Sequence, residues 1–154
     1  MKQIKIISAT KYSSLELDKL LIWKTCLKSR LMDKTVEIPM FEHKIVFNNS
    51  EALSVVYNRE IKKEEHKDKI LVFVHDDAII EDLFLKEKLN EAMKQFDVVG
   101  LVGIEAPITL KDPALWHLMG SRSQYSGAVS HFEKNDSRSF ITLFGPAPKR
   151  VVLL

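Results

Sequence analysis

One stretch of the sequence constrains the fold more than any other. In Lys69–Ala78, KILVFVHDDA, a run of five apolar residues is followed by His75, Asp76 and Asp77. A short apolar run rich in β-branched residues predicts a strand buried on both faces, as in the centre of a parallel sheet. Polar groups at the carboxyl end of such a strand lie where open α/β sheets bind ligands. Two adjacent acids there suggest a hard cation, and a hard cation suggests a phosphate ligand.

The composition is that of a soluble globular protein. The 154 residues suffice for one domain with a core, and 45% of them are hydrophobic. The 23 basic and 21 acidic residues nearly balance, which disfavours nucleic acid as a partner. Cys26 is the single cysteine and fits a reducing compartment. With no signal peptide and no transmembrane segment, we expect a cytoplasmic protein; peripheral contact with the inner face of the membrane stays open.

Apolar periodicity predicts strands and helices in alternation over the first two thirds of the chain. Such an order predicts a doubly wound, mostly parallel α/β sheet. Ser13 and Glu16 form a capping-box pattern for the first helix, and Asp82 can cap the third. The predicted strands are Lys2–Ser8, Lys44–Phe47, Ile70–Val74 and Asp97–Gly103; the predicted helices run from Ser13 to Met32, from Asn48–Ser50 to Lys62, and over Leu83–Gln95.

The last third of the chain has a different pattern. Glu105–Ser123 is a long loop-rich stretch, and Tyr125–Phe132 and Ser139–Phe144 are predicted to be two strands around a turn. The apolar run Arg150–Leu154 ends the chain abruptly, so we expect further sequence to follow it. That run could instead pair with the edge of a second copy, which would give a homodimer.

Each candidate site residue also has a structural interpretation. Asp76 and Asp77 can bind a divalent cation or cap a turn. Asn49 and Asn58 can hydrogen-bond a base or ribose, or cap a helix. Trp116 can stack on a sugar or base, or anchor its loop in the core.

The order of these segments resembles bacterial glycosyltransferases of the GT-A fold. The resemblance rests on Asn49–Ile61, a charged spacer, ILVFVHDDAII and FDVVGLVG, together with Trp116 and the SGAVSH segment Ser126–His131. It covers most of the chain and is nearest to a family 2-like branch that has HDD in place of Asp-x-Asp. It implies a single domain over residues 1–154 with a three-layer α/β/α architecture and antiparallel strands in its last third.

The resemblance also implies a function and a site. It implies a hexosyltransferase that binds a nucleotide-diphospho-sugar donor and transfers the sugar to a glycan or lipid-linked acceptor, in polysaccharide or lipopolysaccharide synthesis. Asp77, with Asp76 and His75, would hold Mn²⁺ or Mg²⁺; an imidazole at the first position favours Mn²⁺, and metal-free binding of the donor is the alternative. Ala9, Thr10, Asn49, Asn58 and Trp116 would border the donor.

Two rival interpretations follow from the same residues. Members of the family continue beyond the segment that matches Val151–Leu154, and that later part holds much of the acceptor site and, in inverting members, usually the catalytic base. The chain is therefore expected to be truncated, and no residue in it is assigned as the base. A non-catalytic nucleotide-sugar-binding module is the first rival. A receiver-like phosphotransfer domain that uses Asp76 or Asp77 is the second.

Overall fold

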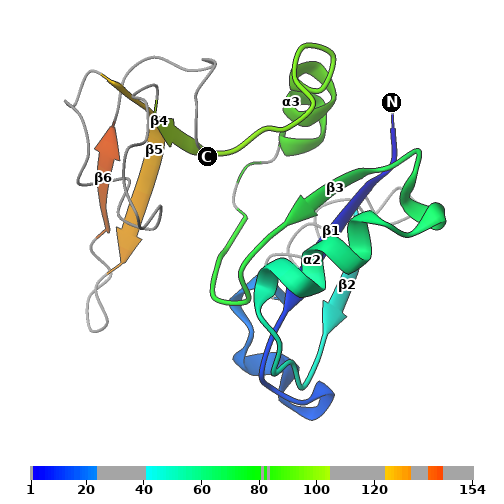
Figure 1. Ribbon diagram of the computed structural model, residues 1–154. Helices are drawn as coiled ribbons and strands as arrows, with labels where there is room; N and C mark the ends of the chain where they lie inside the picture. The colour runs from blue at the N-terminus through cyan, green and yellow to red at the C-terminus, as the bar shows by residue number, and fades with distance from the viewer. Residues whose placement is uncertain are drawn as a thin grey trace, which may run out of the picture. The chain divides into compact units, whose positions relative to one another are not determined.

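The computed structural model describes residues 2–23, 41–80, 82, 84–104, 124–132 and 139–143. The chain forms two compact units, Met1–Lys94 and Gln95–Leu154, and each unit has a β-sheet of its own (Figure 1). Among these described residues, no helix has both the length and the apolar character that crossing a membrane requires.

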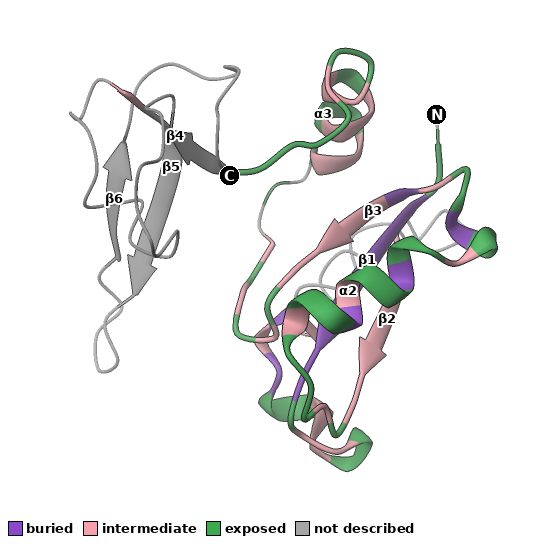
Figure 2. Cartoon of the chain, viewed as in Figure 1, coloured by how far each residue is buried: buried purple, intermediate pink, exposed green. Residues whose placement is uncertain are grey.

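The first unit is built on a parallel sheet with the strand order β2-β1-β3. Its strands are β1 (Ile4–Ala9), β2 (Glu42–Val46) and β3 (Ile70–Phe73). All six residues of β1 are buried (Figure 2), and strands flank it on both sides. Parallel strands joined through a helix make this unit α/β, as predicted.

The prediction that β3 is buried on both faces is wrong. Ile70 is buried, whereas Leu71, Val72 and Phe73 are half-buried. In the part of the sheet that the structure describes, β1 is the central strand and β3 lies at an edge. An apolar run is compatible with either place, so its composition does not reveal which strand is central.

Helix α2 (Leu53–Ile61) covers one face of the parallel sheet. Its Tyr57 ring packs on Phe73 of β3, with the ring centroids 4.6 Å apart, and Val56 is 1% exposed. The helix begins after Ala52 rather than within the predicted cap cluster at Asn48–Ser50. Burial of Val56 and Tyr57 on neighbouring positions gives α2 an apolar stripe towards the sheet.

The last turn of α2 directs a charged residue, not an apolar one, towards the sheet. Ile61, the last residue of α2, is 54% exposed, whereas Glu60 is 3% exposed. Lys44 of β2 donates to both carboxylate oxygens of Glu60, and Lys63 Nζ donates to Oε1 at 2.8 Å. These hydrogen bonds offset the cost of burying the Glu60 charge.

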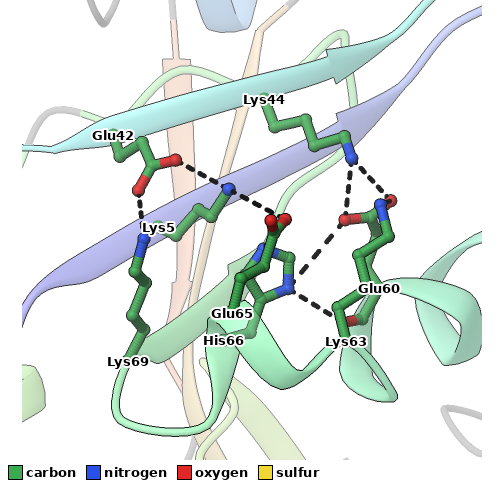
Figure 3. A network of polar contacts seen from close by, with 8 residues as sticks. All are labelled: Lys5, Glu42, Lys44, Glu60, Lys63, Glu65, His66 and Lys69. Carbon is green, nitrogen blue, oxygen red and sulfur yellow. Dashed lines mark hydrogen bonds and ion pairs between the residues drawn. The ribbon is translucent and has the colours of Figure 1, made fainter.

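Glu60 belongs to a polar network at the amino end of the sheet (Figure 3). In β1, the Lys5 side chain is only 7% exposed, and its Nζ lies 2.6 Å from Oε1 of Glu42. His66 ends the short 3-10 helix η2 (Glu64–His66), and its Nδ1 donates to the carbonyl oxygen of Glu60 over 2.9 Å. Charged groups thus link β1, β2, α2 and η2. This amino-end network comprises Lys5, Glu42, Lys44, Glu60, Lys63, Glu65, His66 and Lys69.

The opposite face of the sheet contacts Trp23. The Trp23 ring lies over His43 of β2, with centroids 6.4 Å apart, and His43 Nε2 is 3.3 Å from the hydroxyl of Ser8. His43 is in register with Ile6 of β1, so Ile6, Ser8 and His43 share this face. The segment after β1 therefore crosses to the side of the sheet that α2 leaves open.

That segment is not the single helix predicted from Ser13 to Met32. A 3-10 helix, η1 (Ser14–Lys19), ends at Leu20, whose backbone is extended at φ −85° and ψ 118°. Leu20 and Ile22 are both buried, and the Ile22 N–H donates to the carbonyl oxygen of Asp76 over 3.3 Å. Burial of both side chains accompanies the break in the helix. Residues 24–32 of the predicted helix lie outside the described residues.

Helix α3 (Leu85–Ala92) follows β3 and is shorter than the predicted Leu83–Gln95. The prediction that Asp82 caps this helix is wrong, because Phe84 is the N-cap and no side chain caps the helix; Asp82 Oδ1 instead accepts the N–H of Phe84 over 2.9 Å, in the turn before α3. Lys88 Nζ pairs with Asp82 Oδ2 at 2.6 Å and supports the same turn.

The second unit is an antiparallel sheet of β4 (Val102–Ile104), β5 (Tyr125–Phe132) and β6 (Ser139–Leu143). The two strands predicted for the last third are thereby confirmed. The prediction of a buried strand over Asp97–Gly103 is wrong: Val98 and Leu101 are 72% and 83% exposed, and pairing with β5 begins only at Val102. Gly100 offers no side chain to pack and interrupts that apolar run.

Candidate functional site

The strand order of the first unit creates a reversal point at the carboxyl edge of the sheet. The chain passes from β1 to β2 on one side and then returns to β3 on the other side of β1. Connections leaving β1 and β3 diverge there, and open α/β sheets bind ligands in that crevice. Thr10 follows β1, and His75, Asp76 and Asp77 come shortly after β3.

The segment His75–Asp77 forms a tight turn, the HDD turn, which is held by backbone hydrogen bonds. Before it, the Val74 N–H donates to Ile7 O over 3.0 Å, which keeps the end of β3 against β1. The Ala78 N–H donates to His75 O over 3.2 Å and closes the turn. With Ile22 donating to the Asp76 carbonyl, the turn is anchored from two other segments of the chain.

The turn brings three potential metal ligands together. One ligand atom from each of His75, Asp76 and Asp77 can be chosen such that all lie within 4.8 Å of one another. His75 Nδ1 is 3.9 Å from Asp77 Oδ1, and these two side chains are 65% and 81% exposed. Two carboxylates and an imidazole within this distance suit a divalent cation that keeps water or phosphate oxygens as its other ligands. The residues present therefore fit the predicted cation.

Thr10 and Ala9 form the β1 side of this edge. Ala9 is 6% exposed and is in register with Val46 of β2, so it is a buried residue at the carboxyl end of β1. Thr10 is 3% exposed, and its Oγ1 accepts the N–H of Tyr12 over 3.2 Å. Both residues are where the sequence placed them, and the Thr10 hydroxyl shapes the loop that follows β1.

Asn49 is tied to the same loop but uses its side chain locally. Its N–H donates to Thr10 O over 2.8 Å, which joins the connections after β1 and β2. Its side-chain oxygen accepts the N–H of Glu51 over 3.2 Å, and its side-chain amide donates to Glu51 O over 2.9 Å. The structural interpretation, a turn that leads into α2, therefore describes this side chain.

Asn58 lies outside this cluster. Asn58 is exposed on α2, one position after Tyr57, and successive helical residues point in directions about 100° apart. Asn58 is two positions, or about 200°, from the buried Val56, so it faces away from the sheet. Trp116 lies outside the described residues.

Tyr57 is a site residue that the sequence reasoning treated only as core. Burial of its phenol against Phe73 raises the pKa of Tyr57, and the negative charge of Asp76 raises it further. The hydroxyl therefore lies within the field of the His75–Asp77 turn. One feature of the sequence could have pointed to Tyr57: it is a tyrosine in the helix that directly precedes the strand ending in His75, Asp76 and Asp77.

A second group that was missed lies in the loop after β1. Lys11 Nζ and Lys19 Nζ lie 5.7 and 5.6 Å from the centre of the Tyr12 ring. The Tyr12 carbonyl accepts the N–H of Asn48 over 3.0 Å, and Asn48 has a left-handed φ of 52°. An aromatic ring with two cations beside it therefore lies on the same edge of the sheet as the HDD turn.

Comparisons with protein-family models, with curated proteins and with solved structures find no match to this chain.

Proposed function

We propose that the chain binds a nucleotide-diphospho-sugar at the carboxyl edge of its parallel sheet and belongs to a glycosyltransferase of the GT-A type. The observation that carries the proposal is the grouping of three ligand atoms from His75, Asp76 and Asp77 within 4.8 Å at the reversal point. A cation-binding turn at this position suits a diphosphate, because open α/β sheets bind phosphorylated ligands there.

Each part of the site would have a distinct role in donor binding. Asp77 and Asp76, with His75, would hold Mn²⁺ or Mg²⁺; the cation would neutralise charge on the leaving diphosphate. The Tyr12 ring and the buried Thr10 would border the nucleoside beside β1. Tyr57 would support the turn from α2 through its packing on Phe73.

In the proposed reaction, an acceptor hydroxyl of a glycan or a lipid-linked sugar displaces the diphosphate at the anomeric carbon. The described residues offer no group that we assign as the base. The chain's own contribution would be to bind and orient the donor, which aligns the bond that breaks with the incoming hydroxyl.

Calorimetry with UDP, GDP and their sugars tests this proposal. We expect at least one of them to bind more tightly with Mn²⁺ than with EDTA, and Asp77→Ala to abolish that difference. Asp82→Ala is a matched control, because it removes a carboxylate that hydrogen-bonds to the N–H of Phe84 before α3 and lies outside the HDD turn. Binding of none of these compounds would overturn the proposal.

Acceptor assays separate a transferase from a donor-binding module. Transfer of sugar to a glycan or lipid-linked acceptor would establish the enzyme. Donor binding without transfer and without slow hydrolysis of the donor would favour the module.

A further inference from the structure

We propose that Lys19, positioned by Glu16, is a second source of positive charge at this site and binds the diphosphate directly. This inference rests on the proposed function. Its consequence is that nucleoside diphosphate binding persists when divalent cations are removed. Lys19 and Glu16 both lie in the segment after β1 and outside the HDD turn.

The side chain of Lys19 is held in place by a short chain of hydrogen bonds. The N–H and hydroxyl of Ser13 donate to Glu16 Oε2 over 3.1 and 2.9 Å. Lys19 Nζ donates to the other carboxylate oxygen of Glu16 over 2.7 Å. An ammonium has three donors, so this contact leaves two of them free for a ligand.

Lys19 lies beside the loop after β1, and a residue three positions further along the chain contacts the HDD turn. On one side, its Nζ lies 5.6 Å from the centre of the Tyr12 ring, in the loop that follows Thr10. On the other side, Ile22 hydrogen-bonds to Asp76 O, and three residues of chain span at most about 11 Å. Lys19 is 54% exposed at its side chain, so a ligand can reach it.

The charges on this edge explain why a second positively charged group would favour binding of a diphosphate. Asp76 and Asp77 repel a diphosphate unless a cation lies between them. Lys11 and Lys19 present two positive charges on the β1 side of the same edge. The carboxylate of Glu16 offsets part of that positive charge. It also holds the long Lys19 side chain in one position, so less side-chain entropy is lost when a ligand binds.

The test measures UDP and GDP binding by calorimetry, in EDTA and in Mn²⁺, for the wild type and three variants. We expect binding in EDTA, weakened about tenfold by Lys19→Met, because a hydrogen bond to a charged group contributes about 1.5 kcal/mol or more. Lys19→Arg keeps the charge and should stay within about threefold of the wild type.

Lys67→Met is the matched control. Lys67 forms the same kind of ion pair: its Nζ lies 3.1 Å from Oε1 of Glu64, three residues earlier in the chain. Glu64 begins η2 and Lys67 directly follows it, at the amino end of the sheet. Its removal should leave nucleotide binding unchanged, which separates a contact with the ligand from a general loss of positive charge.

The outcomes separate this inference from the proposed function. Binding with Mn²⁺ but none in EDTA, or equal affinities of Lys19→Met and the wild type in EDTA, would overturn the role of Lys19 alone. Absence of binding under both conditions would overturn the proposed function and this inference with it.

Discussion

Lys44 of β2 donates to both carboxylate oxygens of Glu60, at 2.9 and 3.0 Å, and so ties an outer strand of the described sheet to the helix that covers it. Glu60 is nearly fully buried, and Lys44 is one third exposed at its side chain. The pair therefore joins secondary-structure elements, and its loss should affect the stability of the first unit more than loss of a surface ion pair would.

Truncation of Glu60 should be costly. Glu60→Ala leaves Lys44 without its partner at a partly buried position, and we expect the free energy of unfolding to fall by about 3 kcal/mol. Urea denaturation followed by circular dichroism measures this change. Glu51→Ala is the control, because Glu51 forms a short contact with Arg59 from the same helix, but both side chains are about half exposed.

The control should lose less than about 1 kcal/mol. Equal losses in Glu60→Ala and Glu51→Ala would contradict the structural role assigned to Glu60.

Acid should destabilise the first unit through the same carboxylates. Burial raises the pKa of Glu60, but hydrogen bonds from Lys63 and Lys44 outweigh it, and the net pKa lies below the ordinary 4.5. Hydrogen bonds from Lys5 and Lys69 lower the pKa of Glu42 in the same way. A carboxylate with a lowered pKa binds fewer protons in the folded state than in the unfolded state.

The stability from these carboxylates is therefore fully present above about pH 5 and is lost as pH falls through their folded pKa values. Urea denaturation at a series of pH values should show a falling free energy of unfolding below about pH 4.5, with a shallower fall in Glu60→Gln. A free energy that rises as the solution becomes more acid would contradict this expectation.

The contact between Tyr57 and Phe73 should stabilise α2 against β3 through the ring rather than the hydroxyl. Tyr57→Ala removes a ring whose centroid lies 4.6 Å from that of Phe73, and we expect a loss of about 3 kcal/mol. Tyr57→Phe keeps the ring and should cost less than about 1 kcal/mol. Thermal denaturation compares the two variants; a large loss in Tyr57→Phe would show that the hydroxyl makes a contact needed for folding.

The elements that the sequence predicted well have strong local patterns. Tyr125–Phe132 and Ser139–Phe144 combine strand-forming residues with a polar turn between them, and β5 and β6 follow closely. The HDD turn is also predictable, because an apolar strand that ends in three polar groups defines both the strand and the turn after it.

The errors arise where tertiary contacts override the local pattern. Leu20 looks like one residue of a long amphipathic helix, but its extended backbone lets both Leu20 and Ile22 reach buried positions. Lys5 is a charged residue between apolar ones in the sequence, yet its side chain is only 7% exposed and pairs with Glu42 of the neighbouring strand. Periodicity carries no information about such partners from distant segments.

The candidate site shows the same division. His75, Asp76 and Asp77 are adjacent in sequence, so their proximity could be predicted from the turn alone. The hydrogen bond from Ile22 to Asp76 could not be predicted, and neither could the position of the two lysines beside Tyr12. Both depend on how the loop after β1 folds back towards the end of β3.

The most direct test of the central claim is to locate Mn²⁺ in the nucleotide complex by amide proton–nitrogen correlation spectra. Paramagnetic Mn²⁺ added with UDP or GDP should broaden the amide signals of Asp76, Asp77, Ala78 and Ile22, which lie in or against the HDD turn. Signals of Glu64–His66, at the amino end of the sheet, should persist. Uniform broadening, or selective loss of the Glu64–His66 signals while those of the HDD turn remain, would contradict a cation and diphosphate site at His75–Asp77.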